Sequence, residues 1–212
     1  MAQLPQEFLT RMQDMLGDEF DAFLTSYDAP RTAGLRVNTK KCRTEDFPPL
    51  VPGMWKKIPW IPNGYFVPDG MRMGQSPLYA AGVFYLQEPS AMTPASRLPI
   101  EPGERVLDLC AAPGGKSFTL AEYMENTGVL DAFDLYKGRV NLIKKGAERL
   151  DLSIIHAAVR DAATGVCEKQ YDRVLCDVPC SGLGVIRRKP EIRYKDLDTL
   201  RDLPAVQYKI LE

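Results

Sequence analysis

The sequence predicts an α/β protein whose C-terminal half is built on a parallel sheet. From residue 103 onward, short β-rich runs alternate with helical stretches, and acidic residues stand at or just beyond the ends of three of these runs. Such alternation is typical of right-handed crossovers between parallel strands. The expected strands are Arg105–Leu109, Gly128–Asp134, Ser153–Ala157 and Tyr171–Asp177, and the expected helices between them are Phe118–Met124 and Arg139–Leu150.

A smaller α/β module is expected before this sheet. Residues 4–27 show apolar side chains at helical spacing, with a predicted break at Gly17 and a cap at Asp18. Residues 34–45 alternate like a strand, and residues 78–98 suggest a helix with its lead-in. The change of character at Pro102-Gly103 divides the chain into an N-terminal module, 1–98, and a second domain, 99–212.

The second domain contains fewer strands than such a sheet usually has. Only four strands are expected after residue 103, and a helical stretch with apolar residues from Leu197 to Ile210 closes the chain. A doubly wound sheet that stopped there would leave a strand edge and a helix face uncovered. We therefore expect the chain to be the N-terminal part of a longer protein.

Composition excludes several classes of protein. With 45% hydrophobic residues and a net charge of −1, the chain is neither disordered nor broadly basic, so nucleic-acid binding would need local patches. No apolar run approaches the roughly 20 residues of a membrane span, and the first 30 residues are too acidic for a signal peptide. The five cysteines form no CxxC pair, which argues against a disulfide framework or a metal cluster and favours the cytoplasm.

A glycine-rich turn is expected between the first strand of the second domain and its helix. The segment reads Val106-Leu-Asp-Leu-Cys-Ala-Ala-Pro-Gly-Gly-Lys-Ser117. Small residues here allow a ligand to approach the backbone N–H groups of a helix N-terminus. A phosphate-binding P-loop matches Gly115-Lys116-Ser117 but lacks its first glycine, because Cys110 stands there, and the dinucleotide pattern Gly-x-Gly-x-x-Gly is absent. S-adenosylmethionine is the third candidate, since its carboxylate can use the same groups.

Two acidic residues favour an adenosine-containing ligand. Asp134 lies about 20 residues beyond the glycines at the end of the second strand, where a carboxylate can accept both ribose hydroxyls. Asp161 follows the third strand and is placed to meet the adenine edge.

A second motif, Asp177-Val-Pro-Cys-Ser-Gly182, ends the fourth strand at the edge where open parallel sheets place their active sites. Asp177 is a candidate for holding a proton or accepting one from a base nitrogen, and Cys180 is a candidate nucleophile. Cys176 and the lone His156 lie within expected strands, so a core position is predicted for both.

Two basic clusters are candidate phosphate contacts. One follows the cysteine motif directly, and the other lies in the N-terminal module. Their members are Arg187, Arg188, Lys189, Arg193 and Lys195 in the first, and Arg36 and Lys40 with their neighbours in the second.

Taken together, Cys-Ala-Ala-Pro-Gly-Gly-Lys (110–116) and Asp-Val-Pro-Cys-Ser-Gly-Leu-Gly (177–184) resemble the Sun (Fmu) family of RNA cytosine-5 methyltransferases. Phe84-Tyr-Leu-Gln-Glu-Pro-Ser-Ala-Met92 is similar to the segment that joins that family's N-terminal module to its catalytic domain. The resemblance covers most of the chain. Its first half is more similar to the bacterial small-subunit rRNA methyltransferases of the F type, and residues 134–210 to the B type.

The resemblance implies a Rossmann-like fold that uses S-adenosylmethionine as its cofactor. The implied partner is single-stranded or loop RNA, most of all 16S rRNA, and neither a membrane nor a metal is expected to take part. It implies that Asp134 holds the ribose, that Asp161 lies on the adenine side, and that Asp177 lies near cofactor and target base. Arg139 would help to fix the loop that binds the cofactor. The methionine part of the cofactor would be lined by Cys110, Ala111, Ala112, Pro113, Gly114, Gly115 and Lys116.

In the family that this chain resembles, the cysteine of the Pro-Cys motif, here Cys180, helps to release the methylated base. The attacking thiol belongs to a Thr-Cys motif on a later strand, and no Thr-Cys dipeptide occurs in these 212 residues. The sequence therefore predicts the cofactor-binding part of an RNA (cytosine-5)-methyltransferase that is inactive by itself. A P-loop-like ATPase using Lys116 and Ser117, and a non-catalytic RNA-binding protein, are the alternatives.

Overall fold

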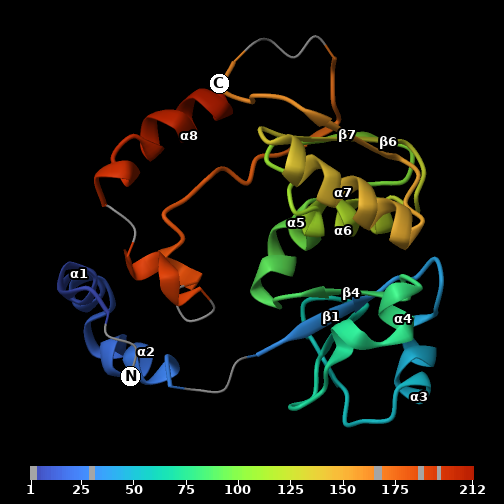
Figure 1. Ribbon diagram of the computed structural model, residues 1–212, viewed down its shortest axis with the longest axis horizontal. Helices are drawn as coiled ribbons and strands as arrows, with labels where there is room; N and C mark the ends of the chain where they lie inside the picture. Colours follow the sequence, from blue (N-terminus) through green and yellow to red (C-terminus); the bar gives the residue numbers. More distant parts are fainter. Residues whose placement is uncertain (1–3, 29–31, 165–168, 186–188, 195–196) are drawn as a thin grey trace. The chain divides into compact units, whose positions relative to one another are not determined.

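The structure is a computed structural model that describes residues 4–28, 32–164, 169–185, 189–194 and 197–212 (Figure 1). The chain divides into two compact units, residues 32–178 with 206–212 and residues 1–31 with 179–205. Within the described ranges, no helix combines the length and the apolar character that crossing a membrane requires.

The unit that holds the N-terminal segment is helical where it is described. The predicted helical region is confirmed as α1 (Gln6–Leu16) and α2 (Phe20–Ser26), separated by a 3-10 turn that begins at Gly17 with a φ of 51°. The predicted cap at Asp18 is wrong, because the residue before α2 is Glu19 and no side chain caps that helix. From 179 onward the elements of this unit are the 3-10 turns η5 (Leu183–Val185), η6 (Pro190–Tyr194) and η7 (Leu197–Leu200). Helix α8 (Leu203–Leu211) follows, and its residues from 206 onward belong to the larger unit.

The larger unit begins with a four-stranded antiparallel sheet. Its order is β2-β3-β1-β4, formed by β1 (Gly34–Val37), β2 (Lys56–Lys57), β3 (Gly64–Phe66) and β4 (Phe84–Gln87). The expected helix over 78–98 is wrong in its centre, because β4 pairs with β1 there and helix α4 ends before Gly82, whose φ is 71°. Short helical segments lie between these strands and after β4: η2 (Thr44–Asp46), α3 (Phe47–Leu50), η3 (Met73–Gln75), α4 (Pro77–Ala80), η4 (Ser90–Met92) and α5 (Thr93–Arg97).

The second sheet of this unit is parallel, as predicted. Its order is β7-β6-β5-β8, formed by β5 (Arg105–Asp108), β6 (Val129–Asp134), β7 (Ile155–Val159) and β8 (Arg173–Leu175). Helices α6 (Gly115–Tyr123) and α7 (Lys137–Leu150) join β5 to β6 and β6 to β7. Both crossovers step in the same direction along the sheet, so right-handedness places both helices on one face (Figure 1). Apolar residues of these elements form the core between helices and sheet.

The other face of the parallel sheet explains one wrong prediction. His156 lies on β7 as expected, but it is exposed instead of buried in the core. Val174 on β8 is also 49% exposed. No helix is described between β7 and β8, and a crossover helix there is what would cover this face.

Polar side chains of the antiparallel sheet region join the two sheets at the C-terminal end of α7. The amide of Asn38, which is buried, donates hydrogen bonds to the carbonyls of Gly82 and Leu150 at 2.9 and 2.7 Å. The ammonium group of Lys41 donates to the carbonyl oxygen of Arg149 at 2.8 Å. The last carbonyls of a helix lack partners within it, so these donors satisfy groups that would otherwise be left unpaired.

Candidate functional site

The candidate site is built around the turn that joins β5 to α6. The N–H of Ala111 donates to the carbonyl of Phe133 at 2.8 Å, which fixes the turn to β6. Gly114 has a φ of 107°, and a Cβ atom there would lie 2.4 Å from the ring of Phe118. Both the backbone angle and the packing therefore require glycine. Helix α6 begins at Gly115, and the first N–H groups of a helix have no partner within it.

Asp108, the last residue of β5, is a site residue that the sequence interpretation missed. Its side chain is completely buried, and its Oδ2 accepts a hydrogen bond from Ser117 Oγ at 2.7 Å. Among the described residues, no hydrogen bond of ordinary geometry reaches its Oδ1, although the backbone of Cys110 lies close enough to the carboxylate to lower its pKa. Burial raises the pKa of Asp108 from 3.8 to about 6, because a desolvated carboxylate is unfavourable. An acidic residue directly after the apolar pair Val106-Leu107 and before the glycine-rich turn was the available signal.

Asp134 and Arg139 hold the other side of the turn. The carboxylate of Asp134 accepts hydrogen bonds from the N–H groups of Ala112 at 3.3 Å and Tyr136 at 3.2 Å, and its side chain is 3% exposed. Nη2 of Arg139 donates to the carbonyl of Ala112 at 2.8 Å and lies 3.4 Å from Asp134 Oδ2. The structure thus brings Ala112, Asp134 and Arg139 together, as the sequence predicted.

Asp161 lies at the same edge of the sheet. It follows β7, is exposed, and accepts a hydrogen bond from the N–H of Ala163 at 2.9 Å. The backbone N–H of the preceding residue, Arg160, donates to the carbonyl of Asp134 at 3.1 Å. Asp161 is therefore close in the fold to Asp134, and its carboxylate is accessible.

Lys116 and Asp177 form an ion pair across the tips of β5 and β8. Their Nζ and Oδ2 atoms lie 2.5 Å apart, and the side chain of Asp177 is half-exposed. Cys110 lies in the turn after β5, where burial raises the pKa of its thiol to about 11. Cys110 is therefore a thiol at neutral pH and can line a ligand but is unsuited to attack.

The cysteines beyond β8 differ in exposure. Cys176 is half-buried, not enclosed in the core as predicted, and burial raises its pKa above the ordinary value. Cys180 is exposed in the segment that follows, so a reagent or substrate can reach it.

The structure places the basic candidates in different environments. The prediction that Arg36 contacts RNA is wrong for this structure, because its side chain is completely buried and paired with Glu122 at 2.8 Å. Lys40 is partly exposed but pairs with Asp151 Oδ2 at 2.6 Å. Lys189 is exposed, and Arg193 lies in η6. Arg187, Arg188 and Lys195 lie outside the described residues.

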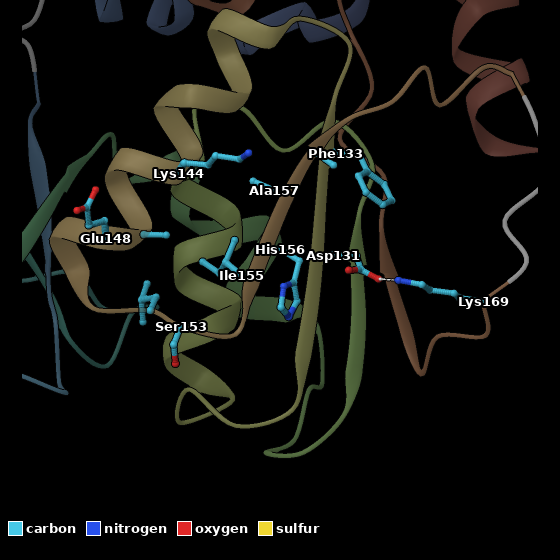
Figure 2. A pocket seen from close by; sticks show the side chains of 12 residues that line it. Asp131, Phe133, Lys144, Glu148, Ser153, Ile155, His156, Ala157 and Lys169 are labelled. Carbon is cyan, nitrogen blue, oxygen red and sulfur yellow. Dashed lines mark hydrogen bonds and ion pairs between the residues drawn. The ribbon is translucent and has the colours of Figure 1, made fainter.

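A cavity of about 600 Å³ lies beside the edge strand β7, and none of the catalytic, cofactor-binding or RNA-binding candidates named from the sequence lines it (Figure 2). Its polar side chains include Asp131, His156 and Lys169. Asp131 Oδ2 is paired with Lys169 Nζ at 3.1 Å and accepts a hydrogen bond from Tyr171 at 2.7 Å. The cavity is thus separate from the glycine-rich turn and its acidic neighbours.

Both parts of the chain, the one with the antiparallel sheet and the one with the parallel sheet, match families of 16S rRNA methyltransferases. Residues 4–89 match the N-terminal domain of 16S rRNA methyltransferase RsmF, and residues 95–212 match 16S rRNA methyltransferase RsmB/F. Ribosomal RNA small subunit methyltransferase F of Enterobacter sp. (strain 638) is 34% identical over 200 residues, covering 88% of this chain and 42% of that protein. Probable ribosomal RNA small subunit methyltransferase B of Bacillus subtilis (strain 168) is 47% identical over 134 residues, covering 61% and 30%.

Solved structures share the fold. The crystal structure of PH0851 has a TM-score of 0.89 at 30% identity, covering 98% of this chain and 49% of that one. A methyltransferase homologue from Pyrococcus horikoshii has a TM-score of 0.82 at 26% identity, covering 99% and 68%. The chain spans less than half the length of the two curated relatives above. The match over residues 95–212 covers more than half of the chain, and the chain therefore belongs to the RsmB/F family of 16S rRNA methyltransferases, whose methyl donor is S-adenosylmethionine.

Proposed function

We propose that this chain is the S-adenosylmethionine-binding part of an enzyme that methylates carbon 5 of cytosine in 16S rRNA. The single observation that carries the cofactor assignment is the buried Oδ1 of Asp108, which no hydrogen bond of ordinary geometry reaches among the described residues and which lies next to the glycine-rich turn. A carboxylate oxygen in this state favours a ligand that brings a cation or a hydrogen-bond donor. S-adenosylmethionine carries an ammonium and a sulfonium group, whereas a triphosphate brings only negative charge.

The surrounding groups fit the rest of that molecule. The first N–H groups of α6 suit its carboxylate, and Asp134 with Asp161 offers acceptors for ribose and adenine along the same edge. Lys116 supports this choice over a P-loop, because its ammonium pairs with Asp177 and so is already neutralised. When bound, the cofactor supplies the methyl group on its sulfonium.

Asp177 and Lys116 are suited to act on the target base. Carbon 5 of cytosine becomes nucleophilic when a thiolate adds at carbon 6 and a proton is held near nitrogen 3. Asp177 stands at the tip of β8 with half of its side chain exposed, which allows it to face that nitrogen while Lys116 steadies it. We assign Cys180 to release of the methylated base, as the family motif suggests, and the first attack to another thiol.

The base has to leave its stack to reach such a pocket, so a single-stranded or loop cytosine is the expected substrate. Arg187, Arg188, Lys189, Arg193 and Lys195 follow the cysteine motif directly, and we propose that this basic segment contacts RNA phosphates. Lys40 remains a weaker candidate because it already pairs with Asp151.

Two measurements test the proposal. Calorimetric titration of this chain with S-adenosylmethionine and, separately, with ATP is expected to show binding of the first only. Binding of ATP alone would favour the nucleotide-hydrolysing alternative and refute the cofactor assignment.

The second measurement concerns the reaction. The chain and the complete product of its gene are incubated with labelled S-adenosylmethionine and 16S rRNA, and the nucleosides are then analysed. Label in 5-methylcytidine with the complete product is expected. Label in a different nucleoside would refute the carbon 5 assignment, and no label with either protein would favour a non-catalytic RNA-binding role.

A further inference from the structure

The antiparallel sheet touches the cofactor turn directly through β4. A Cβ atom at Gly115, the first residue of α6, would lie 2.9 Å from Nε2 of Gln87 and 3.2 Å from Cε1 of Tyr85. The missing side chain of Gly115 therefore points toward β4, and the side chain of Gln87 closes the space behind the first turn of α6.

Gln87 is held in place by two hydrogen bonds. Its Oε1 accepts from Arg36 Nη1 at 2.6 Å, and its Nε2 donates to the carbonyl of Ala91 at 3.1 Å. Nε of the same Arg36 pairs with Glu122 Oε2 at 2.8 Å, and Glu122 is the penultimate residue of α6. One buried guanidinium thus links the last turn of α6 to the residue that packs against its first turn.

Aromatic rings fill the rest of this junction. Tyr85 meets Phe118 edge to face at a centroid separation of 5.1 Å. The ring of Phe118 in turn packs against Gly114 and Gly146, where added Cβ atoms would lie 2.4 and 2.3 Å away. The backbone of the turn consequently has no free space on the side that faces the antiparallel sheet.

We propose that Gln87 is a positioning residue for the cofactor, which fixes the first N–H groups of α6 at the place where the cofactor carboxylate binds. It acts through Gly115 and does not itself contact the ligand. This inference rests on the proposed binding of S-adenosylmethionine at the turn. It gives the antiparallel sheet of the N-terminal module a part in shaping the cofactor site.

A double-mutant cycle tests the role. Gly115→Ala, Gln87→Ala and the double variant are titrated with S-adenosylmethionine by calorimetry, and their thermal midpoints are recorded. Gly115→Ala is expected to weaken binding about tenfold, because the new methyl group pushes the turn away from Gln87. Gln87→Ala alone is expected to weaken binding several-fold, because the support behind the turn is lost. The loss of affinity in the double variant is expected to be smaller than the product of the two single losses, because Gln87→Ala also opens space for the methyl group of Gly115→Ala.

Asn38→Ala provides the matched control, since Asn38 also joins the two sheets but does so at the C-terminal end of α7. It is expected to lower the thermal midpoint without changing the affinity. Gln87→Met, which keeps the volume but loses the acceptor for Arg36, is expected to weaken binding and to speed amide hydrogen exchange at residues 114–117. This variant keeps the test decisive should Gly115→Ala fail to fold.

The inference is overturned if Gly115→Ala binds like the wild type, or if the losses of affinity in the two single variants simply multiply in the double variant. It is also overturned if Gln87→Met leaves both affinity and exchange unchanged, or if Asn38→Ala weakens binding as much as Gln87→Met. Failure of the wild-type chain to bind S-adenosylmethionine would instead refute the proposed function, and this inference with it.

Discussion

Replacing Asp108 by asparagine is expected to change how the stability of the protein depends on pH. The folded pKa of about 6 lies above the ordinary 3.8, so the folded state takes up the proton more readily than the unfolded chain. The stabilisation that results is fully present below about pH 4 and is lost as the pH rises through about 6. The rise in pKa corresponds to about 3 kcal/mol.

Urea denaturation at pH 4 and at pH 8 measures this effect. From pH 4 to pH 8, the unfolding free energy of the wild type is expected to fall by about 3 kcal/mol relative to that of Asp108→Asn, because asparagine does not titrate. Comparing the two pH values cancels any constant cost of fitting the amide beside Ser117. Parallel pH profiles for the two proteins would show that Asp108 is not held in a low-dielectric site, and the reasoning about its unpaired oxygen would fail.

Three other substitutions separate stability from cofactor binding. Arg139→Ala removes the hydrogen bond to Ala112 and is expected to weaken S-adenosylmethionine binding about tenfold in calorimetry; an unchanged affinity would contradict its role in holding the turn. Glu122→Gln leaves the charge of Arg36 buried without its counter-ion, and it is expected to lower the free energy of unfolding in urea by about 3 kcal/mol. Most of this loss is expected to be recovered in Arg36→Met/Glu122→Met, and equal losses in both variants would argue against a charge effect. Asn38→Ala is expected to cost about 2 kcal/mol, and a loss below about 0.5 kcal/mol would mean that water replaces the amide.

The sequence predicted the parallel sheet well, because each of its signals is local. The glycines between strand and helix, the acidic residues at strand ends and the apolar face of Arg139–Leu150 are all readable within about 20 residues. The resemblance to the Sun family, and not these local signals, implied that Arg139 fixes the loop, and the structure does place Ala112, Asp134 and Arg139 in contact.

The errors share a cause, which is that distant partners are invisible in a linear pattern. Arg36 was interpreted as a surface charge, but its counter-ion, Glu122, lies 86 positions away in the sequence. The short run that forms β4 contains no periodicity that distinguishes strand from helix, and only its pairing with β1 decides the matter. A core position is predicted for His156 because it lies within a strand, but the strand pattern alone does not tell that its face of the sheet is uncovered.

The buried pair of Arg36 and Glu122 has a consequence for how such proteins can be cut and recombined. Chains divided near residue 95, where the two family matches meet, would leave Glu122 as an uncompensated anion on a newly exposed apolar surface. Neither half is then an independent building block. A chimaera that takes its first half from another member should fold only when the donor also supplies matching residues at 36, 63 and 87, the positions that meet Glu122 directly or through Arg36.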